Sequence, residues 1–267
     1  DILCAIVKFE KQNKEKAMPV NEYGQMIGES VVGHTSGKLP AIDFLEGRYA
    51  RIEALSVEKH AKDLLAVYGP DTPREMWTYL FQEPVANMEE LVSLLNQMLA
   101  RKDRFFYAIL DKETGKALGT FSLMRIDQNN RVIEVGAVTF SPALKGTRIG
   151  TEAQYLLARY VFEELNYRRY EWKCDALNLP SRRAAERLGF IYEGTFLQAV
   201  DRHEGLSAVT GIASVALPTE LSGKRRAFYS EPETLSTNFI RTQTIPIFMI
   251  VYYEYFVYCD LERSSEN

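Results

Sequence analysis

The sequence predicts a mixed α/β fold whose sheet is mostly antiparallel with one parallel pair, flanked by helices. Three strand-like segments in the middle of the chain are separated by short polar turns, which is typical of an antiparallel meander. A later strand–helix–strand unit requires a crossover, and such crossovers join parallel strands. Segments with helical spacing of apolar residues lie before and after the meander and supply the covering layers.

The expected elements follow from apolar spacing and from helix and turn signals. Thr72-Pro-Arg-Glu75 is a capping box with proline at the first helical position, and Asn87 with Glu90 opens the next helix. The strands expected are Arg48–Glu53, Arg104–Leu110, Lys116–Ile126, Arg131–Phe140, Arg169–Cys174 and Phe190–Val200. The helices expected are Val57–Tyr68, two that begin near Thr72 and Asn87, Thr151–Leu165 and Pro180–Leu188.

Composition and charge argue against several classes of function. The net charge is −4, so no electrostatic field favours a polyanion, and no nucleic-acid partner is expected. Cys4, Cys174 and Cys259 are odd in number and far apart, which matches neither a disulfide framework nor a metal-ligand set. We therefore expect a reducing, cytoplasmic location and no metal. The apolar run Ile247–Cys259 is shorter than the ~20 residues of a spanning helix, so no membrane partner is expected.

The segment Ser141–Glu152 joins a strand to a helix and has the features of an anion site. The start of a helix presents free N–H groups and the positive end of its dipole. Gly146 and Gly150 allow a ligand to approach the backbone closely, and Lys145 and Arg148 add positive charge. The spacing matches neither a Walker loop nor a dinucleotide-binding loop. A plain strand-to-helix turn with solvated charges is the alternative.

A second segment makes the pattern more specific. It contains Asn178-Leu-Pro-Ser181 and ends in Leu188-Gly-Phe190, and the earlier loop reads Lys145-Gly-Thr-Arg148-Ile-Gly150. With these motifs in this order, residues 46–200 resemble the GNAT superfamily of acyl-CoA N-acyltransferases. Within it they are most similar to the RimJ/RimL type of ribosomal-protein N-terminal and small-molecule acetyltransferases. The loop of that family is Arg/Gln-x-x-Gly-x-Gly/Ala, and this chain departs from it with lysine at the first position and Arg148 where glycine is usual.

The resemblance implies acetyl-CoA as the co-substrate, held where the strand Arg131–Phe140 splays from Arg169–Cys174. The backbone near Val138 and Phe140 would pair with the pantetheine, and residues 145–150 would hold the diphosphate. A main-chain N–H of the first strand would meet the thioester oxygen. The cofactor-binding residues implied are Val138, Phe140, Lys145, Gly146, Thr147, Arg148, Ile149, Gly150, Thr151, Asn178 and Ser181.

Two side chains are candidates for the proton transfers of acetyl transfer. Glu134, a lone carboxylate in an apolar strand, is the candidate base for the acceptor amine, and a structural glutamate is the alternative. Ser181 matches the family position beside the CoA sulfur and is the candidate donor to the departing thiolate, with helix capping as its alternative. Trp77 lies in the region that covers the acceptor cleft in this family and is the candidate substrate-binding residue, with core packing as its alternative.

The expected organisation is an extended arm at 1–45, an acetyltransferase domain at 46–200 and a divergent segment at 201–267. The last strand of the fold would come from Ala208–Leu217 or from Phe248–Tyr258, and the sequence does not choose between them. The expected function is direct transfer of an acetyl group from acetyl-CoA to a primary amine of a small molecule or a protein N-terminus. The alternatives are an acyl-CoA-binding module without catalysis and a generic nucleotide-phosphate binder. The sequence leaves the acceptor and the oligomeric state open.

Overall fold

The structure, a computed structural model, describes residues 19–28, 30, 33–196 and 212–217. These residues fall into two units, one within 1–35 and the other within 36–267. In the first unit, a bridge between Val20 and Met26 closes a small turn. The second unit holds the sheet and helices described below.

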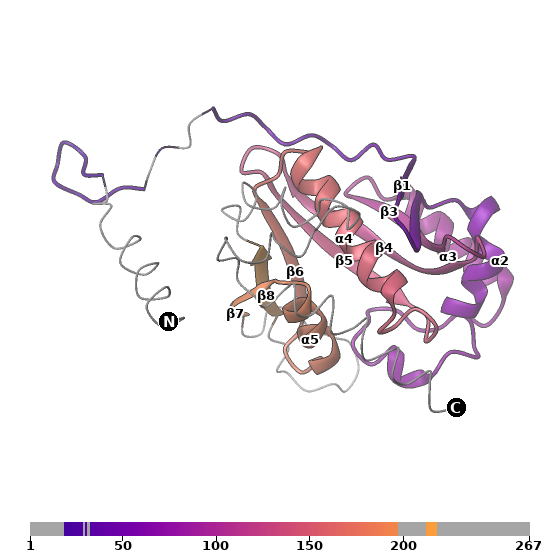
Figure 1. The fold of residues 1–267 in the computed structure, drawn as a ribbon. Helices are drawn as coiled ribbons and strands as arrows, with labels where there is room; N and C mark the ends of the chain where they lie inside the picture. The colour runs from indigo at the N-terminus through magenta and orange to yellow at the C-terminus, as the bar shows by residue number, and fades with distance from the viewer. Residues whose placement is uncertain (1–18, 29, 31–32, 197–211, 218–267) are drawn as a thin grey trace, which may run out of the picture. The chain divides into compact units, whose positions relative to one another are not determined.

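The second unit is built on an eight-stranded mixed sheet with helices packed on it (Figure 1). The strand order in the sheet is β1-β2-β3-β4-β5-β6-β8-β7. The strands are β1 (Phe44–Glu46), β2 (Ala50–Ala54), β3 (Arg104–Asp111), β4 (Ala117–Asp127), β5 (Val132–Phe140), β6 (Arg169–Asp175), β7 (Ile191–Phe196) and β8 (Ile212–Leu217). The helices are α2 (Val57–Tyr68), the 3-10 turn η1 (Arg74–Met76), α3 (Met88–Ala100), α4 (Arg148–Glu163) and α5 (Leu179–Arg187).

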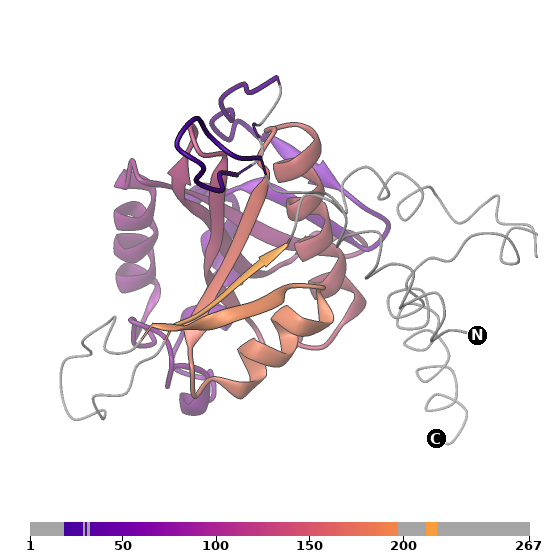
Figure 2. The same cartoon turned by 90° about the vertical axis from the view of Figure 1, so that its left-hand side faces the viewer.

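Alternation of side chains along the strands gives the sheet an apolar layer on each face. Tyr107 and Ile109 of β3 belong to the core that contains Leu157 of α4, whereas Phe106 and Ala108 belong to the core beneath α2 and α3. Figure 2 shows α4 and α5 on one side of the sheet and α2 and α3 on the other. The sheet is thus covered by a helical layer on both faces.

The mixed fold predicted from the sequence is confirmed. Strands β1 to β5 pair consecutively and antiparallel; short turns join β1 to β2, β3 to β4 and β4 to β5, whereas α2, η1 and α3 lie between β2 and β3. The parallel pair is β5 and β6, which are joined by the crossover helix α4.

Most helix boundaries agree with the sequence signals, and one capping interpretation is wrong. Asn87 accepts a hydrogen bond from the Glu90 amide at 3.0 Å and caps α3 as expected. Thr72 does not cap a helix, because η1 begins only at Arg74 and has no side-chain cap. The Thr72 hydroxyl instead donates to the carbonyl of Gly69 at 2.7 Å.

One helix boundary differs from the sequence expectation, and the structure selects one of the two alternatives for the last strand. Helix α4 begins at Arg148 rather than Thr151, so the end of the glycine-containing loop is already helical. The last strand comes from the first of the two alternatives, since β8 (Ile212–Leu217) pairs antiparallel with both β6 and β7. The other alternative, 248–258, lies outside the described residues.

The last residues of the expected arm, from Ser36 on, are part of the second unit. The amide of Gly37 donates to the carbonyl of Gln128, and the amide of Ala41 donates to the Tyr160 hydroxyl at 3.0 Å. Ile42 is buried in the larger core. The compact unit thus starts at Ser36, whereas the sequence analysis placed the boundary after residue 45.

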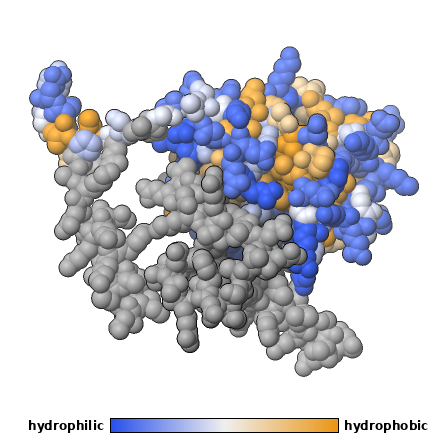
Figure 3. Space-filling model, turned by 45° about the horizontal axis from the view of Figure 1, so that its top comes forward, coloured by the Kyte–Doolittle hydropathy of each residue, from blue (hydrophilic) through white to orange (hydrophobic). Residues whose placement is uncertain are grey.

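The face drawn in Figure 3 is mostly hydrophilic, with hydrophobic residues gathered between the hydrophilic ones. Some of the exposed aromatic surface is partly covered by cations, as where the Arg51 guanidinium lies 4.1 Å from the centre of the Phe44 ring. Within the described ranges, no helix has the length and apolar composition of a membrane span.

Candidate active site

The parallel strands β5 and β6 pair for only part of their length. Their register runs from Val132 opposite Arg169 to Val135 opposite Trp172, and no β5–β6 pair is recorded beyond it. Past this point β6 continues to Asp175 paired with β8, and β5 continues to Phe140 paired with β4. The remaining edge of β5 therefore turns unpaired backbone groups toward a gap between the strands, and this gap is the splay expected from the sequence.

A β-bulge bends β5 away from β6 at the start of this gap. The register between β4 and β5 shifts between Thr120 and Ser122, and Ala137 on β5 has φ +48°. The Ser122 hydroxyl donates to the carbonyl of Gly136 at 3.0 Å and fixes the bulge from the neighbouring strand. Bulges direct backbone groups out of the regular ladder, which frees them for a ligand.

The loop after β5 folds into a cap for helix α4. Leu144 is fully buried and anchors the loop, and its carbonyl accepts a hydrogen bond from the Thr147 hydroxyl at 2.9 Å. Thr147 is the N-cap, and its hydroxyl accepts a bond from the Gly150 amide at 3.2 Å. The amides of Arg148 and Ile149 in the first turn have no intrahelical acceptor, so they carry the positive end of the dipole.

The two loop glycines serve different needs. Gly146 has φ +72°, a left-handed conformation that glycine adopts without strain, and open space surrounds its missing side chain. Gly150 lies in the helix, where a β-carbon would approach the Leu144 carbonyl oxygen to 2.8 Å. Gly146 therefore shapes the loop, whereas Gly150 permits close packing of the loop on its own helix.

The two cations of the loop occupy different surroundings. Arg148 is exposed, and its guanidinium lies 5.8 Å from the centre of the Tyr49 ring, so the side chain is directed to the β1–β2 turn rather than over the helix start. Burial lowers the pKa of the Lys145 ammonium, and the charge of Glu75 in η1 acts in the opposite direction. Arginine at the usual glycine position is accommodated because its side chain packs on Tyr49.

Glu152 ties the first turn of α4 to the β1–β2 turn. Its carboxylate accepts hydrogen bonds from the amides of Arg48, Tyr49 and Ala50 at 2.8, 2.6 and 2.7 Å. A β-carbon at Gly47 would come within 2.5 Å of the same carboxyl group. An anion that accepts three backbone bonds holds the helix start at a fixed distance from β2.

The second motif lies beside the closed end of the gap. Asn178 caps α5 by accepting a bond from the Ser181 amide at 3.1 Å. The Ser181 hydroxyl accepts a bond from the Trp172 indole at 3.0 Å, and Trp172 is the last β6 residue paired with β5. Burial raises the pKa of the Cys174 thiol, and a hydrogen bond from Ser181 acts to lower it. Ser181 is thus placed next to the point where the strands part.

Residues 51–191, more than half of the chain, match a family model described as an acetyltransferase (GNAT) domain. The chain belongs to the GNAT family. It is an acetyl-CoA-dependent N-acetyltransferase, and enzymes of this family acetylate amines.

Similar proteins support this membership over most of the GNAT domain. The chain is similar to a GCN5-related N-acetyltransferase from Brucella melitensis, with 34% identity, a TM-score of 0.70, and coverage of 82% of this chain and 100% of that one. A probable GNAT acetyltransferase from Chromobacterium violaceum has 28% identity and a TM-score of 0.67, with 78% and 100% covered. An uncharacterized N-acetyltransferase, p20, of Bacillus licheniformis is 28% identical over 147 residues, which is 54% of this chain and 81% of that protein.

Glu134 of the GNAT domain is a buried carboxylate bound by two cations. Its side chain is 3% exposed, and both oxygens lie 2.8 Å from Arg125 Nη1. Lys173 Nζ lies 2.6 Å from Glu134 Oε2. A buried carboxylate between two cations fits the structural alternative, and an amine that is to use it as a base must first displace one of them.

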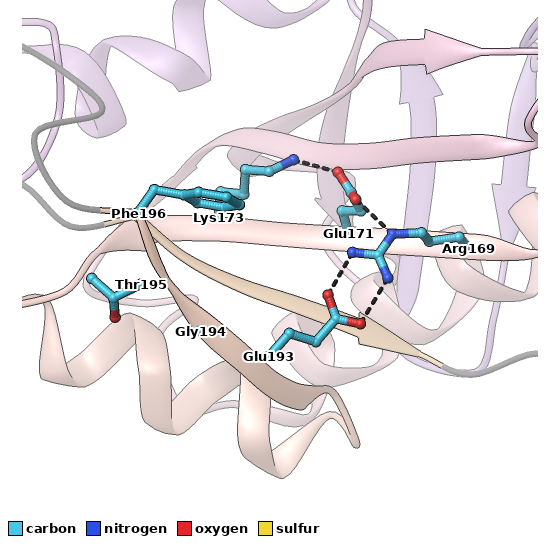
Figure 4. A pocket seen from close by; sticks show the side chains of 7 residues that line it. All are labelled: Arg169, Glu171, Lys173, Glu193, Gly194, Thr195 and Phe196. Atoms are coloured by element: carbon cyan, nitrogen blue, oxygen red, sulfur yellow. Dashed lines mark hydrogen bonds and ion pairs between the residues drawn. The ribbon is translucent and has the colours of Figure 1, made fainter.

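These contacts belong to a wider network of alternating charges on the same sheet face. Lys173 also pairs with Glu171, whose other oxygen accepts a bond from Arg169 Nε at 2.6 Å, and Arg169 binds Glu193 through two further bonds (Figure 4). Burial acts to raise the pKa of Glu171, but the hydrogen bonds from Lys173 and Arg169 lower it overall. Four residues of the network line a pocket: Arg169, Glu171, Lys173 and Glu193.

Trp77 packs in the smaller core of the GNAT domain. It is 4% exposed, its indole nitrogen donates to the Thr72 hydroxyl at 3.0 Å, and its ring centre lies 6.0 Å from that of Tyr68. These contacts fit the packing alternative, and a substrate-binding role for Trp77 stays a prediction. Of the nearby aromatics, Phe81 is the exposed one, at 76%.

Sequence reasoning missed the partners of the predicted residues. The alternation Arg169-Tyr-Glu171-Trp-Lys173 was a visible sign that one face of β6 is charged and the other aromatic. No comparable sign existed for Glu152 or Tyr49, because their contacts join segments that are far apart in the chain. Among the residues that the structure describes, no group of three His, Cys, Asp or Glu side chains could hold a metal ion.

Proposed function

We propose that this GNAT enzyme moves an acetyl group directly from acetyl-CoA to a primary amine of a small molecule or a protein N-terminus. The observation that carries the proposal is the end of β5–β6 pairing at Val135 and Trp172. The freed edge of β5, with Val138 and Phe140, offers backbone groups to the pantetheine. A β-carbon at Gly150 would lie 3.4 Å from the Phe140 ring, so the end of β5 is next to the first turn of α4.

The diphosphate of CoA would lie at the amino end of α4. The amides of Arg148 and Ile149 point out of the first turn, and Lys145 adds a cation beside them. Thr147 and Gly150 act by shaping this turn, and Thr151 extends it with a hydroxyl bonded to the Thr147 carbonyl. In this proposal Arg148 binds no phosphate through its side chain, because the side chain lies over Tyr49.

The proton transfers are assigned to Glu134 and Ser181. Glu134 accepts a proton from the acceptor ammonium once that amine has replaced Lys173 at its Oε2 atom. The Ser181 hydroxyl accepts a bond from Trp172 and donates toward Cys174, and in this proposal its proton turns from Cys174 to the departing thiolate. Asn178 orients Ser181 by capping the same helix.

The proposal also includes the subtype of the enzyme and its location in the cell. The motif Asn178-Leu-Pro-Ser181 followed by Leu188-Gly-Phe190 supports a RimJ/RimL-like enzyme. The scattered cysteines support a cytoplasmic location.

Binding and turnover are tested separately. Acetyl-CoA is titrated while thermal unfolding is followed, with ATP as the control ligand, and thiol release is then measured over a panel of small amines and peptides with free N-termini. We expect stabilisation by acetyl-CoA, none by ATP, and thiol release with at least one amine. Stabilisation without any thiol release would indicate an acyl-CoA-binding module, and equal stabilisation by ATP would indicate a general phosphate binder.

A charge reversal locates the diphosphate. Lys145→Glu places a carboxylate beside the helix start, and we expect the affinity for acetyl-CoA to fall by about tenfold, which corresponds to ~1.4 kcal/mol. Lys62→Glu makes the same change in net charge on the exposed face of α2 and is the matched control. Equal losses in both variants would contradict a site at the loop.

A further inference from the structure

Lys173 stands at the mouth of the gap between β5 and β6. It is the first residue of β6 beyond the last pair, Val135 with Trp172. Because Tyr170 and Trp172 face the core beneath α4 and α5, alternation directs Lys173 to the opposite face of the sheet. The side chain is 17% exposed. Its ammonium group is therefore partly buried at the position where the strands separate.

Two carboxylates from neighbouring strands hold this ammonium. Glu134 of β5 and Glu171 of β6 are register partners, and Lys173 Nζ contacts both, at 2.6 Å from Glu134 Oε2. The remaining carboxylate oxygens are bound by Arg125 and Arg169. Among the described residues of this network, Lys173 alone is a primary amine, and it is bound to the proposed base.

The ammonium is also reachable from a pocket. Arg169, Glu171, Lys173 and Glu193 line it together with β7 residues 194–196, and its volume is about 490 Å³ including space open to solvent. Figure 4 shows the Lys173 side chain extended along β6 toward Glu171. Rotation of its flexible stem moves the amine between the carboxylates and the gap without a change in the backbone.

We propose that Lys173 occupies the position of the acceptor amine and is itself an acetylation site of this enzyme. This inference rests on the proposed function, since it requires the thioester to lie in the gap. The amide bond forms between Lys173 Nζ and the acetyl carbon, and the carbon–sulfur bond of the thioester breaks. Of the two protons that the ammonium loses, one passes through Glu134 to solvent and the other ends on the thiol of free CoA.

Two other lysines among the described residues, Lys62 and Lys145, lack this combination of features. Lys62 is exposed on α2 and is expected to react only at the background rate of any surface amine. Lys145 lies in the loop assigned to the diphosphate, at the other end of the bound co-substrate. Neither has a carboxylate partner in the proposed catalytic position.

The test uses the full chain with acetyl-CoA and no added amine. Intact mass and peptide mapping over time should show one acetyl group per chain, on Lys173, at a rate independent of chain concentration because the reaction is intramolecular. Lys62 serves as the internal background site. In the unmodified sequence, excess free CoA should slow acetylation of Lys173 and leave that of Lys62 unchanged. Lys173→Arg, which keeps the ion pairs, should remove the fast phase.

The outcomes separate the inference from the proposed function. Thiol release with an external amine while Lys173 remains unmodified would overturn the inference and leave the function intact. Absence of both acetyl-CoA binding and thiol release would overturn both. Acetylation spread evenly over exposed lysines, or insensitive to free CoA, would show chemical acetylation and overturn the inference.

Discussion

Glu152 on the first turns of α4 lies 2.6 Å from the backbone nitrogen of Tyr49 in the β1–β2 turn. The same carboxylate accepts the amides on either side of Tyr49. A helix that is to hold a diphosphate with its first amides must be fixed relative to the sheet. In this enzyme the anchor is a single side chain one turn inside the helix.

Glu152→Gln is expected to weaken both stability and co-substrate binding. The amide NH₂ of glutamine would face a backbone N–H. At least one hydrogen bond is therefore lost, and two N–H donors then face each other. With ~1.5–3 kcal/mol for a hydrogen bond to a charged group, we expect a loss of about 2–4 kcal/mol. Thermal unfolding and acetyl-CoA titration measure the two effects. Glu163→Gln, on the exposed side of the same helix, is the control, and an equal loss there would contradict the anchor.

Gly150→Ala has two opposite effects on stability, a higher helix propensity and a steric clash. Alanine in a helix gains ~1 kcal/mol over glycine, but the new carbon would lie 2.8 Å from the Leu144 carbonyl oxygen, and buried Leu144 leaves that oxygen little room to move. Overpacking of this kind costs ~1–3 kcal/mol, so we expect net destabilisation, measured by denaturant unfolding. A stabilised variant would contradict the packing described.

Gly146 provides the matched comparison, because its constraint is backbone conformation rather than space. Gly146→Ala should cost ~1–2 kcal/mol through its φ of +72°, and Gly146→Asn should recover part of that loss, since asparagine tolerates this conformation. Gly150→Asn should show no such recovery. The same recovery at both positions would contradict the distinction.

Arg148→Gly restores the residue usual in the family at this position. Because the guanidinium lies over Tyr49, we expect the affinity for acetyl-CoA to change by less than about threefold, or ~0.7 kcal/mol. Isothermal titration at matched salt measures it. A loss as large as that expected for Lys145→Glu would show that Arg148 does bind the diphosphate.

The sequence predicted the architecture well because its signals are local. Apolar spacing, the Asn87 cap and the motif at Asn178 each depend on a few neighbouring residues, and the structure confirms these elements. The start of α4 was placed three residues late because Gly150 reads as a loop residue, whereas here the Thr147 hydroxyl caps its amide. The partners of Glu134 depend on the register of three strands, which a single sequence does not specify.

Stability should depend on pH through His60. Burial lowers the pKa of its imidazole below the ordinary 6.5, while the charges of Glu53 and Asp63 oppose the shift and that of Lys59 adds to it. Below pH 6.5 the unfolded chain takes up a proton more readily than the folded one. The free energy of unfolding should therefore fall as the pH drops below 6.5, by at most ~1.4 kcal/mol per pH unit from this group.

His60→Gln removes this titration. Chemical denaturation between neutral and mildly acidic pH should show a shallower decline for the variant than for the unmodified chain. Above pH 6.5, where His60 is neutral in both states, the two profiles should run parallel. Parallel profiles over the whole range would show that His60 does not cause the decline.

The structural and catalytic roles of Glu134 can be separated by a double substitution. Glu134→Gln leaves Lys173, which is 17% exposed, with Glu171 as its one remaining carboxylate partner, and we expect a loss of ~1.5–3 kcal/mol in the free energy of unfolding. Arg125 is 53% exposed and can turn to solvent, so it adds little to this loss. Adding Lys173→Gln restores the charge balance of the network, so the double variant should recover part of that stability.

Activity then distinguishes the two roles. If Glu134 only supports the fold, thiol release with an external amine recovers together with stability in the double variant. If Glu134 is the base, kcat stays low while stability recovers, because no carboxylate remains to accept the proton of the acceptor ammonium. Lys173→Gln alone keeps the carboxylate and frees its Oε2 atom, and it should retain turnover. We expect the second pattern. Glu134 is then the base for the acceptor amine, and Lys173 is bound to it until an acceptor replaces Lys173.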